Sequence, residues 1–259
     1  MESQSIFIFT WDDRQEHLQK MLEAKGYLVI KEKRYIPGAY SWILLPVPKT
    51  EEYLKTLYPQ LKKGQGVVGW GIPQSFFDKG KQDGILFADY NTSSYVVEEN
   101  AKLTAEGIIL EAMKQGDAGI ENRFSMITGF GRCGKVLAAK LQSMGSVVLV
   151  ADRKEQKRKE AEKQGYLSCN LEQVKDWIGK SDFLFNTIPA PVIGVPVLDQ
   201  VGEKTILFDI ASKPGGIDFD YCKKKKIKAD IYPGLPGKYA PKRAAEILLK
   251  VIEETISGR

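Results

Sequence analysis

Short apolar runs alternate with amphipathic stretches along most of this chain. SIFIF at 5–9 and FSMIT at 124–128 have the length and composition of buried strands. Residues 13–25 place Leu18 and Leu22 on one face of a helix. Because such elements alternate through short connections, the pattern predicts an α/β fold with parallel sheets covered by helices on both faces.

The same pattern predicts two α/β domains, each Rossmann-like or flavodoxin-like. The other predicted strands are YLVI, SWILL, GVVGW and GILFA, then VVLVA, YLSC, DFLFN, TILFD and KADIY. Further helices are expected over 51–61, 102–115 and 241–257, the second with Thr104, Glu106 and Gly107 near its start. The break near 116–123 is the best domain boundary. The expected segments are an N-terminal substrate-side domain over 1–100, a connecting helix over 101–119, a doubly wound domain over 120–240 and a closing helix over 241–259.

Composition favours an ordinary globular protein of the cytoplasm. The chain has 259 residues, 43% of them hydrophobic and 27% charged, and a formal net charge of +5. The lysine run 223–226 is interpreted as a solvated helix end, so no nucleic-acid partner is expected. No apolar run approaches the ~20 residues that span a bilayer. The N-terminal stretch lacks the features of a secretion signal, and we expect no membrane partner.

Cysteine spacing predicts neither a metal site nor a disulfide framework. Cys133, Cys169 and Cys222 are odd in number and widely separated. This usage fits a reducing compartment.

The strongest candidate for chemistry is GFGRCG at 129–134. It follows a predicted strand and opens a helix that leads to a second strand, VVLVA. Gly129 would allow the tight turn, Gly131 would let a pyrophosphate approach the backbone, and Gly134 would let helix and strand pack closely. Arg132 and Cys133 would present N–H groups at the positive helix end. The motif predicts a dinucleotide site.

The choice between NAD and NADP depends on two adjacent residues of opposite charge. Asp152 ends the second strand, where a carboxylate accepts ribose hydroxyls and favours NAD. Arg153 follows at once and would clamp a 2′-phosphate. We predict NADP, with NAD as the alternative.

Loops after later strands are expected beside the nicotinamide and its ribose, because ligands bind at the carboxyl ends of strands in such sheets. The candidates after the fourth strand of the second domain are Thr187, Ile188 and Pro189. Those after the fifth are Ala211 and Ser212.

Histidine usage argues against one common reaction type. The chain has a single histidine, His17, in the first predicted helix. A hydroxyacid dehydrogenase with a histidine base in its second half is therefore disfavoured.

Several long motifs resemble the A subunits of dipicolinate synthases. They are GFGRCG (129–134), NTIP (186–189), FDIASKPGGIDF (208–219) and YPGLPGKYAPKRAAEIL (232–248). Shorter matches are Asp13-Arg14-Gln15, Leu45-Pro46-Val47 and Thr104-Ala105-Glu106-Gly107. The chain departs from the family at Thr10-Trp11-Asp12, where a glycine-rich turn is usual, and at Asp152, where a small residue is usual. These departures bear on substrate and cofactor more than on fold.

The resemblance implies an oxidoreductase that converts dihydrodipicolinate, made from 4-hydroxy-tetrahydrodipicolinate, to pyridine-2,6-dicarboxylate, with a role in spore formation. Aromatisation drives the loss of hydride and proton, so no histidine is needed. The candidates for substrate binding are Arg14, Lys213, Lys238 and Lys242. Arg14, Lys213 and Glu106 are the candidates for catalysis, Glu106 as proton acceptor.

The resemblance also implies a partner chain, a flavoprotein-like B subunit, and leaves a homo-oligomer open. Two alternatives remain. One is a non-catalytic NAD(P)-binding partner subunit, with which the missing histidine is equally compatible. The other is a paralogous dehydrogenase of another small carboxylate.

Overall fold

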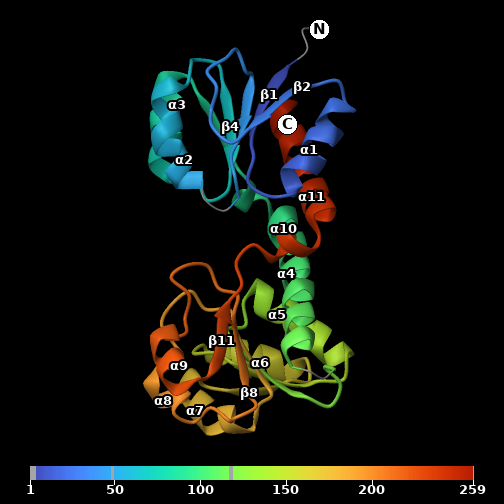
Figure 1. Cartoon of the computed structure of the whole chain (residues 1–259), viewed down its shortest axis with the longest axis vertical. Helices are drawn as coiled ribbons and strands as arrows, with labels where there is room; N and C mark the ends of the chain where they lie inside the picture. Colours follow the sequence, from blue (N-terminus) through green and yellow to red (C-terminus); the bar gives the residue numbers. More distant parts are fainter. Residues whose placement is uncertain (1–3, 48–49, 117–118, 259) are drawn as a thin grey trace. The chain divides into compact units, whose positions relative to one another are not determined.

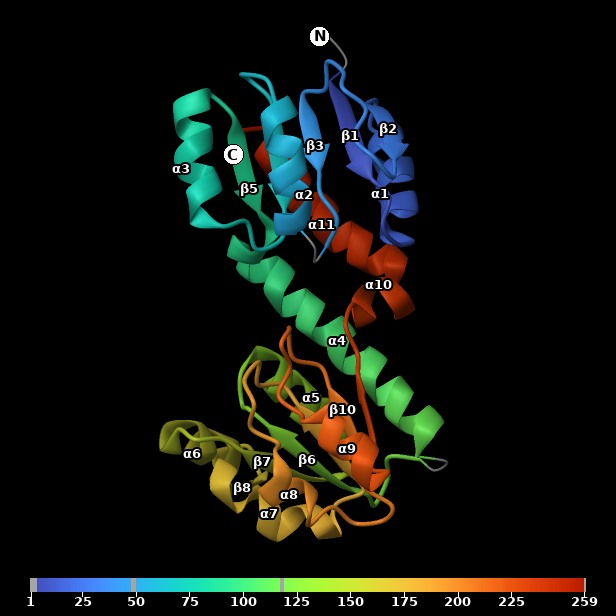
Figure 2. The ribbon, with the colours of Figure 1, turned by 60° about the vertical axis from the view of Figure 1, so that its left-hand side comes forward.

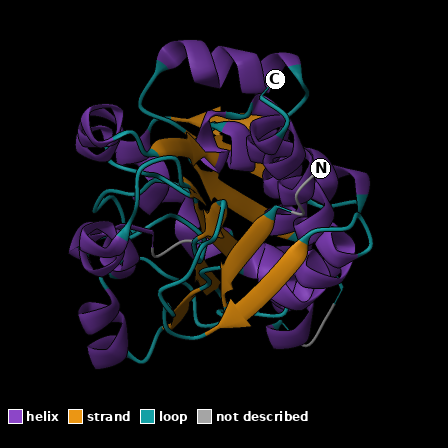
Figure 3. Ribbon diagram, turned by 90° about the horizontal axis from the view of Figure 1, so that it is seen from above, coloured by secondary structure: helices purple, strands orange, loops and turns teal. Residues whose placement is uncertain are grey.

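The computed structural model describes residues 4–47, 50–116 and 119–258. The chain forms two compact units, Met1–Asn100 with Pro236–Arg259 and Ala101–Leu235. The predicted connecting helix over 101–119 and the predicted boundary at 116–123 both include residues 117–118, which lie outside the described residues, as does Arg259. Figure 3 shows strands flanked by helices, which confirms the predicted α/β class.

The first unit contains a five-stranded parallel sheet with the order β2-β1-β3-β4-β5. Its strands are β1 (Ser5–Phe9), β2 (Leu28–Glu32), β3 (Trp42–Leu44), β4 (Gly66–Gly69) and β5 (Leu86–Asp89). Its helices are α1 (Arg14–Glu23), α2 (Thr50–Leu57), α3 (Gln74–Asp83), α11 (Pro241–Ile256) and the short η1 (Tyr58–Gln60) and η2 (Tyr90–Thr92). The strand order is that of flavodoxin-like sheets.

Helices cover both faces of this sheet. The helices α2 and α3 lie on one side, and α1 and α11 lie on the other (Figure 1, Figure 2). The core on the α2 side includes Phe7, Ile43 and Val67, each with no exposed surface. In α11, Ala245, Leu248 and Ile252 are buried at spacings of three and four, which explains why this amphipathic segment packs as a helix.

The second unit contains a six-stranded parallel sheet with the order β11-β10-β9-β6-β7-β8. Its strands are β6 (Phe124–Thr128), β7 (Val147–Ala151), β8 (Leu167–Cys169), β9 (Phe183–Asn186), β10 (Ile206–Asp209) and β11 (Lys228–Ile231). Its helices are α5 (Arg132–Ser143), α6 (Glu155–Lys163), α7 (Val174–Trp177), α8 (Val195–Leu198), α9 (Phe219–Lys225) and the short η3 (Leu171–Gln173) and η4 (Ile178–Lys180). The strand order is that of a doubly wound Rossmann sheet, as predicted.

From β6 the strands β7 and β8 are added toward one side of the sheet, and from β9 the strands β10 and β11 are added toward the other side, so the strand order reverses between the parallel neighbours β6 and β9. Such a switch point separates the loops at the carboxyl ends of the strands and leaves room for a ligand. The glycine-rich motif follows β6, so the fold places the motif at this switch point.

Two helices cross from one unit into the other, and one of them is longer than predicted. They are α4 (Ser94–Gln115) and α10 (Leu235–Tyr239). The predicted start of this helix at residue 102 is wrong, because α4 begins at Ser94. Buried Val96, Ala101, Ala105 and Ile108 continue one apolar face past the expected start.

Candidate functional site

The turn between β6 and α5 depends on Gly129. Three residues join Thr128 to Arg132. Gly129 has a φ of +92°, and its N–H donates to the Ala151 carbonyl on β7 at 2.8 Å. A Cβ at Gly129 would lie 2.5 Å from Thr187 Oγ1. Only glycine adopts this backbone without strain and also leaves this space.

The other two glycines have opposite surroundings. A Cβ at Gly134 would lie well inside 3.0 Å of the Gly129 carbonyl oxygen, so helix and turn touch there. A Cβ at Gly131 would have no atom within 4 Å, and the backbone of Gly131 has φ −82° and ψ −163°. Among the described residues, no side chain caps the start of α5. Open space in front of unpaired helix N–H groups fits a diphosphate.

Asp152 holds the glycine-rich turn from the end of β7. Its Oδ2 accepts the Phe130 N–H at 2.9 Å, and its Oδ1 accepts the Lys154 N–H at 2.9 Å. Each carboxylate oxygen has further acceptor capacity, so ribose hydroxyls can still bind there. The sequence placed Asp152 at this edge but did not indicate its bond to the turn.

Two guanidinium groups belong to the segment that follows Asp152. Arg158 Nη1 donates to the carbonyl oxygens of Asp152 at 2.8 Å and Arg153 at 3.0 Å. The side chain of Arg153 is exposed. A phosphate beside this strand end would therefore meet cationic as well as anionic groups.

Cys133 and Arg132 occupy the first turn of α5 with different exposure. Arg132 is exposed, and Cys133 is half-buried. Burial raises the pKa of the Cys133 thiol, and the nearby Arg132 opposes this rise. A protonated thiol is a poor nucleophile, so the geometry gives Cys133 a packing and backbone role.

The loops after β9 and β10 begin at the carboxyl ends of these neighbouring parallel strands. Thr187 Oγ1 donates to the Thr128 carbonyl at 2.9 Å, which fixes the β9 loop against the glycine-rich turn. Ile188 is half-buried and Pro189 exposed, while Ala211 is buried and Ser212 exposed. The structure therefore brings Thr187 to the turn.

Three polar side chains under these loops lie outside the predicted set of site residues. Thr128, Asn186 and Asp209 end three adjacent strands and have no exposed surface. The signal in the sequence is a polar residue at the last position of each apolar strand. Its meaning depends on hydrogen bonds, which the sequence does not display.

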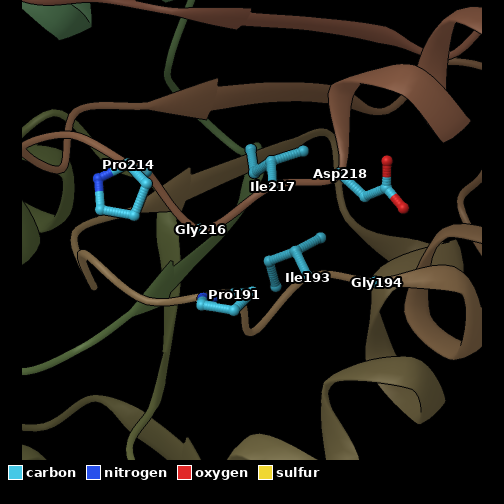
Figure 4. Close-up of a pocket in the computed structure, with 8 residues that line it drawn as sticks. Pro191, Ile193, Gly194, Pro214, Gly216, Ile217 and Asp218 are labelled. Carbon is cyan, nitrogen blue, oxygen red and sulfur yellow. The ribbon is translucent and has the colours of Figure 1, made fainter.

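A pocket of about 340 Å³ lies beside the loop that follows β10 (Figure 4). Its walls are the segments 191–194 and 214–218, which are joined by hydrogen bonds from Ile193 N–H to the Gly216 carbonyl and from Asp218 N–H to the Ile193 carbonyl. Asp218 is the only ionisable residue among the lining residues. Such a lining offers no cation to a dicarboxylate.

The predicted lysines are exposed. Lys213 lies in the loop after β10, and Lys242 lies in the first turn of α11. Lys238 lies on α10, with its Nζ 4.9 Å from the centre of the Tyr239 ring. Exposed ammonium groups are accessible to anions, but exposure alone does not define a site.

Arg14 is enclosed within the first unit. It is 3% exposed, and its Nε donates to Asp12 Oδ1 at 2.9 Å. Its Nη2 donates to the Val47 carbonyl at 2.9 Å. A Cβ at Gly237 would lie 2.8 Å from Arg14 Nε. The guanidinium thus bonds to Asp12 and to the Val47 carbonyl and lies close to Gly237. Its predicted contact with substrate stays a prediction.

Glu106 lies in the interior of α4, not at a helix start. Its Oε1 accepts from Lys140 Nζ at 2.9 Å. Lys140 is eight residues along α5 from Arg132, so about 12 Å of helix separates this pair from the glycine-rich turn. The role of Glu106 as proton acceptor stays a prediction.

The described part of the chain contains neither a cluster of metal-binding side chains nor a helix that could span a membrane. There, no group of histidine, cysteine, aspartate and glutamate side chains could hold a metal ion. None of the described helices is long and apolar enough to span a bilayer. The cysteines are free, and burial raises the pKa of the Cys169 and Cys222 thiols to about 11.

Comparisons of sequence point to nucleotide-dependent oxidoreductases. A family model described as the NAD-binding domain of D-isomer specific 2-hydroxyacid dehydrogenases matches residues 96–210. The dipicolinate synthase A subunit of Bacillus subtilis (strain 168) is 34% identical over 158 residues, which are 61% of this chain and 53% of that protein. The matched stretch therefore spans about half the length of this curated relative.

Comparisons of structure cover more of the chain. The crystal structure of the dipicolinate synthase A subunit from Bacillus halodurans has a TM-score of 0.83 and 26% identity, and the match covers 97% of each chain. The crystal structure of its Bacillus subtilis counterpart has a TM-score of 0.81 over 100% of this chain and 97% of that one, and at 23% identity it shows the fold alone. The chain thus has the fold of a nicotinamide-dinucleotide-binding dehydrogenase and is similar, over most of its length, to the A subunits of dipicolinate synthases, as its sequence predicts.

Proposed function

We propose that this chain is an oxidoreductase that oxidises dihydrodipicolinate to pyridine-2,6-dicarboxylate with NADP. The single observation that carries the proposal is the open, N–H-lined space in front of Gly131, at the switch point of a doubly wound sheet. Similarity to the A subunits of dipicolinate synthases supports the choice of substrate.

The oxidation removes one hydride and one proton from the dihydropyridine ring, which becomes aromatic. When bound, the dinucleotide supplies the hydride acceptor. The chain's own residues bind and orient the reactants. The N–H groups of Arg132 and Cys133 would hold the diphosphate, and the loops that contain Thr187 and Ala211 would border the nicotinamide. Lys213, Lys238 and Lys242 are the accessible cations proposed for the substrate carboxylates.

The decisive assay mixes the purified chain with NADP and freshly prepared 4-hydroxy-tetrahydrodipicolinate. We infer from the similarity to these A subunits that a B subunit takes part, so the assay is run with and without a dipicolinate synthase B subunit. Ultraviolet absorbance of pyridine-2,6-dicarboxylate should rise together with NADPH. Dinucleotide binding without turnover in any pairing would contradict the proposal and favour a non-catalytic NAD(P)-binding subunit. Turnover of a different small carboxylate would favour a paralogous dehydrogenase.

The preference for NADP is proposed from Arg153. Its guanidinium is exposed, and both oxygens of Asp152 already accept backbone N–H groups, which lowers the repulsion that a 2′-phosphate would meet. Arg153→Ala should weaken NADP binding about tenfold to a hundredfold and leave NAD binding unchanged, because charge-assisted hydrogen bonds contribute about 1.5–3 kcal/mol. Calorimetric titration with NADP and with NAD measures the ratio of the two affinities.

Lys175→Ala is the matched control, since it also removes one exposed positive charge from the same unit. It should leave the ratio of NADP to NAD affinity unchanged. Equal losses of both affinities in Arg153→Ala would refute the phosphate-clamp role.

A further inference from the structure

A buried chain of hydrogen bonds links the ends of three adjacent strands. Thr128, Asn186 and Asp209 pair side by side in the sheet, at the carboxyl ends of β6, β9 and β10. Thr128 Oγ1 donates to Asn186 Oδ1 at 2.7 Å, and Asn186 Nδ2 donates to Asp209 Oδ1 at 2.9 Å. This chain of hydrogen bonds runs in one direction, from hydroxyl through amide to carboxylate, because a carboxylate accepts hydrogen bonds and does not donate them.

Asp209 also fastens the loop that follows it. Its Oδ1 accepts the Ala211 N–H at 3.0 Å, and its Oδ2 accepts the Gly216 N–H at 2.7 Å and the Ile217 N–H at 3.3 Å. A Cβ at Gly215 would lie 2.9 Å from Asp209 Oδ2. The glycines of SKPGG therefore let the loop close around the carboxylate.

Asn186 fastens the neighbouring loop in the same way. Its Nδ2 donates to the Ile188 carbonyl at 3.0 Å, and its Oδ1 accepts the Ile188 N–H at 3.1 Å. The same amide thus joins the loop after β9 to the carboxylate that holds the loop after β10. A substitution at either residue is therefore expected to alter both loops.

A purely packing role does not account for a carboxylate here. Burying a charge costs several kcal/mol unless hydrogen bonds compensate, and an apolar side chain would fill a strand end at lower cost. Among the described residues, the Asp209 carboxylate accepts hydrogen bonds from Asn186, Ala211, Gly216 and Ile217, and the last three lie in the loop that the carboxylate closes. The carboxylate therefore determines the loop's shape.

We propose that Asp209 and Asn186 are positioning residues that preset the two loops for the nicotinamide half of the dinucleotide. The inference rests on the proposed function, because it assumes that these loops border the nicotinamide. Neither side chain touches the ligand. They act through Ile188 and Ala211. Replacing Asp209 or Asn186 should therefore weaken binding of the nicotinamide half and leave binding of the half held by the glycine-rich turn unchanged.

The test compares two ligands on one variant. Asp209→Asn keeps the side-chain shape but turns one acceptor into a donor that faces N–H groups. NADP should bind about tenfold to a hundredfold more weakly, which is the effect of one or two mispaired buried groups. The fragment 2′-phospho-ADP-ribose lacks the nicotinamide and should bind with unchanged affinity. Calorimetric titration of the purified full chain measures both.

Asp182→Asn is the matched control within the same sheet. Asp182 also accepts a hydrogen bond from a backbone N–H, that of Phe124 at 2.8 Å, and one from the Arg123 guanidinium at 2.9 Å. It lies at the amino-terminal end of β9, whereas Asp209 lies at the carboxyl end of β10. Asp182→Asn should leave both affinities unchanged. If Asp209→Asn does not fold, Thr128→Val removes only the outermost donor and should shift NADP affinity in the same direction by about threefold.

The outcomes separate this inference from the proposed function. Equal losses for both ligands, or no loss for either, would overturn the positioning role. Selective loss of NADP affinity together with an absence of turnover by the unaltered chain would support positioning and contradict the proposed reaction. Failure of the unaltered chain to bind NADP would overturn both.

Discussion

Replacing Gly134 by alanine should lower the free energy of unfolding by about 2–3 kcal/mol and abolish dinucleotide binding. The added Cβ would lie well inside 3.0 Å of the Gly129 carbonyl oxygen, which is backbone and cannot rotate away. Alanine is favoured over glycine by about 1 kcal/mol within helices. A net loss of unfolding free energy must therefore come from the clash and not from helix propensity. Relief of the clash requires α5 to move from the turn, which removes the site of the diphosphate.

Urea unfolding followed by far-ultraviolet circular dichroism measures the loss, and calorimetry measures binding. Gly119→Ala is the matched control, because a Cβ there would have no atom within 4 Å. It should leave stability and binding nearly unchanged. If Gly134→Ala unfolds at the same urea concentration as this control, the added Cβ does not destabilise the protein and the predicted clash is absent.

The sequence predicts the strands well because their apolar runs are short and sharply bounded. FSMIT and SIFIF occupy the predicted positions of β6 and β1. The helix α3 over residues 74–83 is not among the helices that the sequence predicts, and it contains Gly80. Gly80 serves tertiary packing, since a Cβ there would lie 2.6 Å from the Phe87 ring on β5. Contact with a distant strand thus overrides the local preference.

The positions of the glycines in the candidate site could be predicted, but not the partners of its polar side chains. The spacing of Gly129 and Gly134 follows from local steric needs, which the sequence displays. The engagement of Asp152 with the Phe130 N–H depends on the register of β6 and β7. The enclosure of Arg14 depends on Gly237, more than 200 residues away in sequence. Long-range contacts of this kind require the fold.

Replacing Gly131 by alanine should weaken NADP binding at least about tenfold without unfolding the protein. Its backbone angles, φ −82° and ψ −163°, suit alanine, and the new Cβ would meet no protein atom within 4 Å. The methyl group would instead occupy space that the diphosphate needs to reach the helix N–H groups. Calorimetric titration with NADP measures the affinity, and thermal unfolding measures the integrity of the fold.

Gly194→Ala is the control for this change, because Gly194 has nearly the same local structure. It precedes α8 with φ −105° and ψ −168°, and a Cβ there would also have no atom within 4 Å. Both variants lose the small preference for glycine over alanine at a helix start, so any common shift in thermal midpoint cancels. Only Gly131→Ala should change NADP affinity. Equal affinities in the two variants would mean that no diphosphate rests against the start of α5, and the proposed oxidoreductase would lose the binding site on which it depends.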